Sequence, residues 1–479
     1  MGGLTLRTYK LTLDLSAGVP CLDSGAPEVL DSGRLRVRWL LRRRPRARLA
    51  RVHDGSAHLE AFRGPTGGRS LGVYVHVPYC RSICTFCPYF RQVLRDRGEL
   101  ERYLGSLLRE LELYGRALEG LGLEVVELHV GGGTPSLVPP RFYGDLLGRL
   151  SEFFRVRCGV GIEANPEDLR DPRYVEELYS SGVDEVSVGV QSFDRRVLKA
   201  LGRKHPPEDG EVALRNCLGA GLRWVNVDLM FLPPSIRGYV EMGLDEKLRA
   251  FRRDLERSVE LGAHQVTFYA TVVPRSSPGY RLAELDRLQQ ELDSIDLFVE
   301  EALDFAESSG LHLVRVYSAS RRPYEYATVN LEMVGPLVGL GAGAWGNTGY
   351  YQYVNVHSVA TYVELLREGR PPAAYARRLS EGSRAWRLLF DQLSAVVVRE
   401  ETFRSLGLGL PLAARALLRL MELSGLVERV SGGYRLTRRG VIEVYKSVIN
   451  YVVELPVKVT EVLAELGRRG EYPQEVVIG

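Results

Sequence analysis

The sequence predicts an α/β fold, in which a partial (β/α)6 TIM-like barrel is followed by a C-terminal winged-helix-like helical domain. Between residues 72 and 309, short β-rich runs alternate with longer helical runs, which is typical of βαβ units on a parallel sheet. After about residue 373 this alternation gives way to leucine-rich helices. Polar motifs follow successive predicted strands, at the end where ligands gather in such folds. A flat doubly wound sheet is the alternative arrangement of the same units.

Length and composition indicate a globular protein with a large core. The 479 residues allow roughly three domains, or one barrel with additions. Hydrophobic residues make up 45% and charged residues 26%, and 63 basic against 60 acidic residues leave a net charge of only +3. That balance indicates no particular class of partner. No apolar run approaches about 18 residues and the start lacks a signal-peptide pattern, so we expect no membrane span and a cytoplasmic location.

The predicted segments are an N-terminal extension at 1–70, the barrel at 71–372 and the C-terminal domain at 373–479. Within the extension, residues 34–41 alternate basic and apolar side chains, as a half-buried strand does. The basic run at 42–51 has a composition that can contact phosphates, but a solvated face or a loop is the favoured interpretation. "GPTGG" at 64–68 predicts a hinge.

Six strands and the helices between them make up the predicted barrel. The strands are expected at residues 72–77, 125–130, 157–164, 184–190, 223–231 and 264–270. The first helix is indicated by leucines at positions 100, 104, 107, 108 and 111, and later helices are expected near 141–154, 172–181, 210–221, 246–262 and 282–309. In the C-terminal domain, "LMELSGLVERVSGGYRLTRRG" (420–440) is typical of a winged helix. This stretch is not unusually basic, so nucleic-acid binding is not favoured.

Three cysteines stand close together directly after the first predicted strand. Cys80, Cys84 and Cys87 have the spacing C-x3-C-x2-C. Three thiolates suit an iron–sulfur cluster in which one iron has no protein sulfur and is open to a small molecule. Zinc with a fourth ligand such as His76 is the alternative metal site, and a chance trio in a loop is the other interpretation. The scattered cysteines are expected to be small buried hydrophobic residues: Cys21, Cys158 and Cys217.

Further motifs follow the other predicted strands. "GGGTPS" (131–136) follows the second strand, "EANPED" (163–168) the third and Gln191 the fourth, while Asp228 lies near the end of the fifth. Because the carboxyl ends of parallel strands meet at one edge, these residues are expected to face one cavity. A glycine run there lets the backbone approach a ligand closely, because no Cβ intervenes.

The cysteine pattern after the first strand of a βα barrel is similar to that of the radical S-adenosylmethionine (SAM) superfamily. Together, the ordered motifs resemble the oxygen-independent coproporphyrinogen III oxidase family, which includes the oxidase, a heme chaperone and heme-opening methyltransferases. The motifs are "YVHVPYCRSICTFC" (74–87), "GGGTPS" (131–136), "SVGVQSFDRRVLKALGRKH" (187–205), "VDLMF" (227–231) and "GLGAGAWG" (339–346). The likeness covers about residues 74–353 and the winged-helix-like tail, and implies a partial barrel of the radical SAM type.

The resemblance also implies cofactors, partners and residue roles. The cofactors are a 4Fe–4S cluster and one or two SAM molecules; the reduced cluster cleaves SAM to a 5'-deoxyadenosyl radical, while the protein binds, orients and excludes water. The implied partners are a tetrapyrrole or other small substrate and an electron donor such as flavodoxin or ferredoxin. The implied cluster ligands are Cys80, Cys84 and Cys87. The implied SAM contacts are Tyr74, Phe86, Gly132, Gly133, Thr134, Glu163, Ala270 and Trp345, with Gln191, Arg203 and Asp228 around a second SAM.

Several of these residues also have plainer interpretations. Glu163 and Asp228 are residue types that cap helices or form ion pairs. Arg203 is also compatible with a surface position, and Tyr74 with a place in the core of a strand. The "GGGTP" motif alone is a weak turn signal and gains weight from its place after the second strand.

Departures from the family pattern leave the specific activity open. The oxidase's N-terminal R-Y-T-S-Y-P-type segment is absent, and Tyr89 stands where the oxidase has a fourth cysteine. The heme chaperone's H-N-x-x-Y-W motif is not found in residues 325–344, and Pro88 replaces a glycine of the heme-opening methyltransferases. "DLMFLPPSIRG" (228–238) also departs from the family's "DLMFGLPGQT". The sequence thus predicts a radical SAM enzyme acting on a porphyrin or another planar substrate, with radical methylation or non-catalytic heme trafficking as alternatives.

Overall fold

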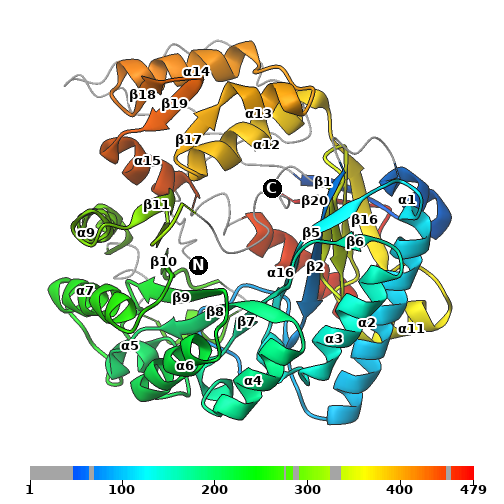
Figure 1. Ribbon diagram of the computed structural model, residues 1–479, viewed down its shortest axis with the longest axis horizontal. Coiled ribbons are helices and arrows are strands. Elements are labelled where there is room, and N and C mark those ends of the chain that lie inside the picture. Colours follow the sequence, from blue (N-terminus) through cyan, green and yellow to red (C-terminus); the bar gives the residue numbers. More distant parts are fainter. Residues whose placement is uncertain are drawn as a thin grey trace, which may run out of the picture.

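The computed structural model describes residues 47–63, 69–274, 277–283, 291–323, 336–448 and 455–478. One large mixed sheet runs through it, and its centre consists of six parallel strands (Figure 1). These strands are β2 (Ser70–Val77), β5 (Glu124–Gly132), β7 (Val160–Ala164), β8 (Val183–Gln191), β9 (Trp224–Phe231) and β10 (Gln265–Ala270). All six predicted strands are therefore confirmed, each to within a few residues. Their order in the sheet follows the chain, as in a barrel, whereas a doubly wound sheet would reverse it.

Helices connect the parallel strands and cover the outer side of the sheet (Figure 1). They are α2 (Arg97–Leu118), α3 (Arg141–Ser151), α4 (Pro172–Ser180), α5 (Arg195–Ala200), α6 (Pro207–Gly219), α7 (Leu244–Glu260) and α9 (Ile295–Ser308). The predicted helix at 282–309 is not continuous: residues 282–283 are not helical, residues 291–292 are, and α9 begins only at Ile295. A turn at residues 293–294 precedes α9, because Asp and Ser favour caps and turns over helix interiors. Residues 284–290 lie outside the described residues.

The sheet extends on both sides of the parallel centre. Beyond β2 it continues through β13 (Leu337–Leu340), β14 (Trp345–Asn347), β15 (Tyr351–Asn355), β16 (Ala373–Arg378), β1 (Ala47–Arg51) and β20 (Glu475–Ile478). Beyond β10 it continues through β12 (Ser318–Ser320) and β11 (His312–Arg315). Within the described ranges no hydrogen bonds join the two edges, so the barrel is partial.

Helix α12 (Glu381–Ser394) lies across the opening of the sheet between β11 and β16 (Figure 1). It starts just after β16, and at its other end the Ser394 carbonyl accepts a hydrogen bond of 2.8 Å from Val316 N, next to β11. Every residue from Ser383 to Ser394 is buried, including two arginines and an aspartate. The helix therefore closes the gap between the two ends of the sheet, and it does so by side-chain packing and not by strand pairing.

The N-terminal segment is partly built into the main sheet. Residues 47–51 form β1, which pairs with both β16 and β20, so the loop interpretation of the basic run is wrong for this part. Leu49 is buried while its neighbours Arg48 and Ala50 are exposed, as in a half-buried strand. The predicted strand at 34–41 and the hinge at 64–68 lie outside the described residues. Because β1, β16 and β20 come from the first and third predicted segments, the boundaries near 70 and 373 remain proposals.

The C-terminal region contains a winged-helix arrangement, as predicted. Its elements are β17 (Val397–Arg399), α13 (Glu400–Ser405), α14 (Leu412–Leu423), β18 (Val427–Val430), β19 (Gly433–Leu436) and α15 (Arg438–Val448). The strands form a small antiparallel sheet in the order β17-β19-β18. The outer face of α14 exposes Leu412, Leu420 and Leu423. In the described part of the chain, no helix combines the length and apolar character that spanning a membrane requires.

The scattered cysteines differ from one another. Cys217 is fully buried, as predicted for a small hydrophobic residue. Cys158 is only half-buried, and its Sγ lies 3.9 Å from the Val125 carbonyl oxygen. Cys21 lies outside the described residues.

Candidate active site

The loop that carries the three cysteines is held in place by contacts to distant segments. Thr85, between Cys84 and Cys87, accepts and donates: its N–H donates to Leu201 O (3.2 Å), its hydroxyl to Ala200 O (3.1 Å), and its carbonyl accepts from Gly279 N (3.2 Å). Gly279 and Gly202 lie so close that a Cβ on either would come within 2.8 Å of Thr85 atoms. The loop is therefore fixed by the chain itself.

The three thiols lie near one another and near two basic side chains. Burial raises the pKa of Cys80, and it raises the pKa of Cys87 to about 11, while the charge of Arg91 opposes both shifts. Arg203 also donates from Nη1 to the Cys84 Sγ at 3.4 Å. A cation beside a thiol favours the thiolate, which is the form that binds metals. Buried thiols with adjacent cations are a suitable donor set for an iron–sulfur cluster.

The surroundings argue against the zinc alternative. Both ring nitrogens of His76 are engaged, because Nε2 donates to Phe90 O (2.8 Å) and Nδ1 accepts from the Tyr74 hydroxyl (2.9 Å). In the described residues, no three His, Cys, Asp or Glu side chains are placed to hold a single metal ion. The three thiols lie close enough that the charge of one, once ionised, raises the pKa of another. Sulfurs that are near but not gathered on one point fit a cluster, which thiolates hold at its corners.

The glycine motif meets the end of β7. Gly132 has φ +113°, a conformation that favours glycine, and its N–H donates to Glu163 Oε2 at 3.0 Å. Burial raises the pKa of Glu163, but the hydrogen bond and charge of His129 (3.4 Å) and the Gly132 N–H lower it more, so the net shift is downward. Thr134 is hydrogen-bonded to the Cys80 thiol. The motif thus links the cysteines to a carboxylate that stays ionised.

Asp228 lies on β9 and is not a helix cap. Its carboxylate accepts hydrogen bonds from Ser187 Oγ (2.6 Å) and Asn226 Nδ2 (3.0 Å). Burial raises its pKa to about 7, and the charge of Glu163 contributes, although the two hydrogen bonds oppose the shift. Two carboxylates on adjacent parts of the strand edge are therefore held at different pKa values, so that Glu163 is the better anion and Asp228 the better proton acceptor near neutral pH.

Gln191 is the last residue of β8, and Arg203 follows α5 and reaches back to the end of β8. Gln191 has φ +66°, which is uncommon for a residue other than glycine and costs free energy, as strained residues at functional sites often do. Arg203 is half-buried, and besides Cys84 its Nη2 donates to Asn165 Oδ1 (2.8 Å) and Gly189 O (2.9 Å). Arg203 is thus held among the residues at the strand ends and is not a surface residue. We call this group the strand-end cluster: Cys80, Cys84, Cys87, Thr134, Glu163, Gln191, Arg203 and Asp228.

The remaining predicted contacts are more dispersed. Tyr74 stacks on His129, with ring centres 6.0 Å apart, so it faces the same side as Glu163. Phe86 is half-buried and packs against a small apolar cluster that includes Met230. Ala270 is buried at the end of β10, and Trp345 is half-buried on β14; within the described ranges neither makes a hydrogen bond to another predicted site residue.

One network was not predicted from the sequence. Arg81, next to the first cysteine, pairs with the buried Asp168 carboxylate, which accepts from Ser136 Oγ at 2.7 Å. Ser136 Oγ in turn accepts from Asn165 N (3.1 Å), and Asn165 binds Arg203. These residues lie within or beside the motifs "GGGTPS" and "EANPED", so the signal was present. Their hydrogen bonds fix three strand ends relative to one another.

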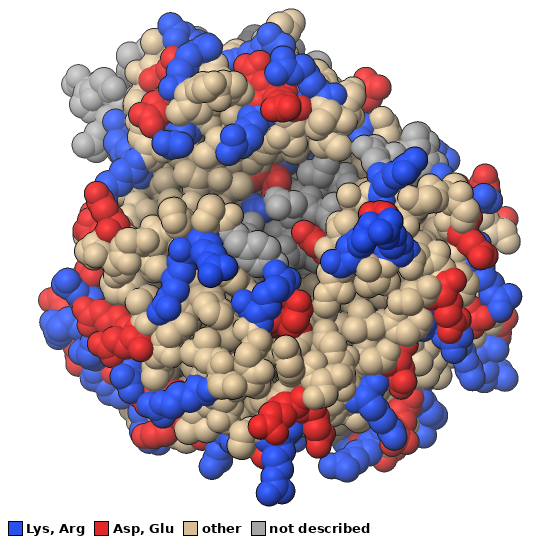
Figure 2. All heavy atoms as spheres, in the orientation of Figure 1, with Lys and Arg blue, Asp and Glu red and all other residues tan. Residues whose placement is uncertain are grey.

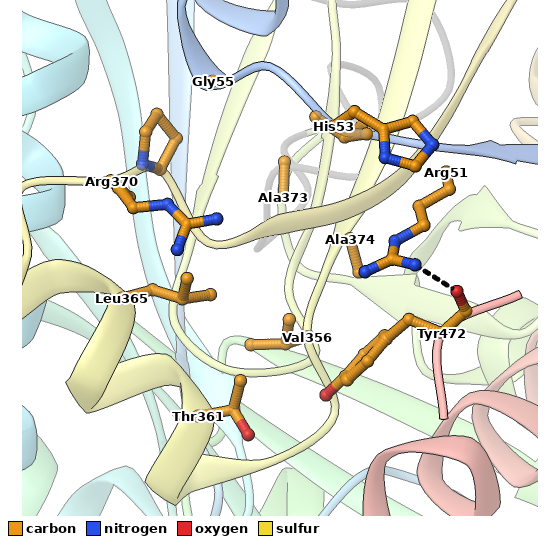
Figure 3. Close-up of a pocket in the computed structure, with 12 residues that line it drawn as sticks. Arg51, His53, Gly55, Val356, Thr361, Leu365, Arg370, Ala373, Ala374 and Tyr472 are labelled. Atoms are coloured by element: carbon orange, nitrogen blue, oxygen red, sulfur yellow. Dashed lines mark hydrogen bonds between the residues drawn. The ribbon is translucent and has the colours of Figure 1, made fainter. Parts of the chain in front are cut away.

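Figure 2 shows that this face of the molecule is hollowed between the C-terminal domain at the top and the barrel below it. A separate pocket of about 210 Å³ lies between α11 (Val359–Arg367), β1 and β16 (Figure 3). Arg51 and Arg370 line it from two sides, and Arg51 donates to Tyr472 O at 2.6 Å. None of the predicted site residues lines this pocket, so it is distinct from the strand-end cluster.

Comparison with known proteins agrees with this arrangement of cysteines, glycines and acids. Residues 74–236 match the family model of the radical SAM superfamily. Heme chaperone HemW of Mycobacterium tuberculosis is 30% identical over 316 residues, which are 65% of this chain and 78% of that protein. HemW of Escherichia coli is 28% identical over 284 residues (58% and 70%). An anaerobic coproporphyrinogen III oxidase of Cereibacter sphaeroides is 29% identical over 326 residues (65% and 70%).

The fold is also that of a solved structure. Coproporphyrinogen III oxidase of Escherichia coli, a radical SAM enzyme, superimposes with a TM-score of 0.67 at 20% identity, covering 85% of this chain and 95% of that one. Membership of the superfamily gives the chain its cofactors, a 4Fe–4S cluster and SAM. The chain therefore belongs to the radical SAM superfamily, in the family that contains the heme chaperone HemW and oxygen-independent coproporphyrinogen III oxidase.

Proposed function

We propose that this protein is a radical SAM enzyme that acts on a porphyrin- or heme-type substrate, in the manner of coproporphyrinogen III oxidase. The observation that carries this proposal is the constellation of three thiols, Thr134 and Glu163 at the ends of three strands, with Arg203 beside them. Both groups of named relatives handle tetrapyrroles or heme, which supports the substrate class.

The residues of the site have different roles in binding the cluster and SAM. When bound and reduced, the cluster supplies the electron that cleaves SAM to a 5'-deoxyadenosyl radical. Cys80, Cys84 and Cys87 hold the cluster in a fixed loop, and the bare backbone of Gly132 and Gly133 admits a ligand at short range. Glu163 remains ionised and accepts hydrogen bonds from amino or hydroxyl groups of SAM.

Radical methylation is the second candidate. In the oxidase the counterparts of Gln191, Arg203 and Asp228 surround a second SAM, and all three are present here. Arg203 and Asp228 offer a cation and an acid, which suits the zwitterionic methionine end of such a molecule. The strained backbone of Gln191 is a feature that a ligand site would maintain.

Non-catalytic heme trafficking is the third candidate, and the similarity to HemW favours it. The region that corresponds to the chaperone's H-N-x-x-Y-W motif begins at residue 325, and residues 325–335 lie outside the described residues. The proposed electron donor is a flavodoxin or ferredoxin. Nucleic acid is not a proposed partner, because α14 exposes leucines where a DNA-reading helix would carry basic and polar side chains.

The test is anaerobic reconstitution of the cluster, reduction with dithionite, and assay for 5'-deoxyadenosine with coproporphyrinogen III, with heme and with no substrate. We expect SAM cleavage, and product mass then separates loss of carbon dioxide from gain of a methyl group. Absence of cleavage under all three conditions would contradict both enzymatic candidates and leave heme trafficking.

Cys80→Ala is expected to abolish the brown cluster chromophore, because two thiolates cannot replace three. Cys217→Ala is the matched control, since that thiol is buried elsewhere and its loss should leave the absorbance unchanged. An unchanged spectrum in Cys80→Ala would refute the ligand assignment.

A further inference from the structure

Arg384, in the first turn of α12, is a buried guanidinium with few partners. Only 6% of its surface is exposed. Its Cζ lies over the Tyr350 ring, 3.5 Å from the centre. Among the residues that the structure describes, no acceptor lies within reach of its Nη1 and no carboxylate pairs with it. The ring contact is therefore the main interaction of a charge that is almost fully removed from water.

Such a charge is expensive unless something compensates it. Buried charged groups in proteins are paired or hydrogen-bonded, because removal from water without a partner costs far more than one contact with a ring returns. A buried polar atom without a protein partner therefore needs a partner from elsewhere, which is a water, an ion or a ligand group. A guanidinium stacked face-on keeps its edge donors available, and that planar fork matches the two oxygens of a carboxylate.

Strand alternation shows on which side of the sheet this group lies. Tyr351 and Tyr353 pack on His58 of α1 (Gly55–Phe62), which is on the outer, helix-covered side. Gln352 stands between them and must point to the opposite side. There it accepts hydrogen bonds of 2.9 and 2.6 Å from Arg377. This is the inner side of the curved sheet in Figure 1.

The same inner side carries a predicted cofactor contact. Val354 follows Gln352 by two residues and so shares its side, and Trp345 pairs directly with Val354. Tyr350, under Arg384, immediately precedes β15. Arg387, one turn further along α12, is also buried and adds positive charge. Arg384 and Arg387 thus place positive charge beside the part of the sheet that bears Trp345.

We propose that Arg384, backed by Tyr350, binds a carboxylate of the substrate, so that the preferred ligand is a tetrapyrrole with free acidic side chains. The tetrapyrrole ring rests on the proposed function, whereas the carboxylate rests on Arg384. Its burial makes the pair strong, because little water screens it.

The test compares two ligands that share one macrocycle, one with anionic side chains and one in which those side chains are esterified. Coproporphyrin III has free carboxylates and its tetramethyl ester has none; both are already oxidised and need no turnover. Binding to the full-length, anaerobically reconstituted protein is followed by the shift of the porphyrin absorbance. The variants are Arg384→Gln, which removes the charge, and Arg384→Lys, which keeps the charge but loses the fork. Arg378→Gln is the matched control, because Arg378 is exposed and, next to Arg377 on the strand, points to the other side.

We expect Arg384→Gln to weaken binding of the free acid at least about tenfold and to leave binding of the ester unchanged. Arg384→Lys should bind the free acid with an affinity between those of the wild type and Arg384→Gln. Arg378→Gln should bind both ligands like the wild type. Without ligand, Arg384→Gln should unfold at or above the wild-type temperature, since an unpaired buried charge has been removed. A merely structural arginine would instead lower that temperature and weaken acid and ester equally.

If Arg384→Gln bound the free acid as tightly as the wild type does, Arg384 would not be the group that binds the carboxylate, while the tetrapyrrole assignment would stand. Equal weakening of acid and ester would also exclude that role for Arg384. If the wild type bound neither porphyrin, the substrate class would fail and this inference with it. The three patterns are distinct, so the cause of a failure can be read from the data.

Discussion

Arg384 in the first turn of α12 and Arg315, which packs against the last turn of the same helix, are both buried, but their partners differ. Arg315 is fully enclosed and donates to Asp391 Oδ1 (3.0 Å) and Ser394 Oγ (2.6 Å). Arg384 has a ring under it and no carboxylate among the described residues. Burial of a charge therefore does not by itself indicate function. A charge whose partners are supplied by the chain holds the fold, and a charge whose partner is missing is available to a ligand.

Arg315→Met should have the largest effect on stability. It leaves the buried Asp391 carboxylate without its cation, and breaking a buried pair in this way costs about 3–5 kcal/mol. The free energy of unfolding from urea titration measures it. The loss should also loosen the closure of the barrel, because Arg315 ties β11 to the end of α12.

Two controls sharpen the comparison. Replacing both partners, Arg315→Met with Asp391→Leu, should restore much of the stability, because no unpaired charge remains. Arg384→Met should cost far less than Arg315→Met. Equal losses at the two arginines would show that α12 uses both for structure, and the distinction would be wrong.

Tyr445→Phe tests a second contact between the C-terminal domain and the barrel. The Tyr445 hydroxyl on α15 donates to Phe268 O (3.0 Å) and accepts from Ala270 N (3.1 Å), while its ring stacks on Phe268. Phenylalanine keeps the stacking and loses both hydrogen bonds, so we expect a loss of about 1–3 kcal/mol. Amide hydrogen exchange at Ala270 should also become faster. Unchanged exchange there would mean that water replaces the hydroxyl without loss.

The difference between these contacts and the strand-end cluster explains what the sequence could predict. Cys80, Thr134 and Glu163 could be proposed from the sequence because each lies within a short motif at the end of a strand, and parallel strands bring such ends together. Tyr445 bonds to residues 175 and 177 positions away, and no local pattern marks such a pairing. The closure of the barrel by α12 could not be predicted from the sequence for the same reason.

Errors in the sequence prediction have local causes. The helix expected from residue 282 was inferred from apolar spacing, and a turn at residues 293–294 interrupted it because Asp and Ser compete for backbone hydrogen bonds. The basic run at 42–51 was expected to be a solvated face or a loop, but its residues 47–51 form a strand with one buried leucine between exposed neighbours. Charge content alone does not separate a loop from an edge strand.

Asp228→Asn should change the free energy of unfolding least of all these variants at acidic pH. At alkaline pH it should stabilise the protein, whereas Arg315→Met and Tyr445→Phe destabilise it. The folded-state pKa of Asp228, about 7, is raised above the ordinary value of 3.8, so the folded protein binds a proton that the unfolded chain has released. The wild type therefore loses stability as the pH rises from about 4 to about 7. Asparagine cannot ionise, so this part of the pH dependence should disappear.

At pH 5 the protonated Asp228 resembles asparagine, and the two proteins should differ by about 1 kcal/mol or less. At pH 8 the variant should be the more stable of the two, which urea titrations at both pH values would reveal. Ser187→Ala is the informative partner, because it removes a hydrogen bond that favours the carboxylate and should raise the folded-state pKa further. If Asp228→Asn instead lost stability at pH 8, Asp228 would belong with Asp391 among the groups that hold the fold.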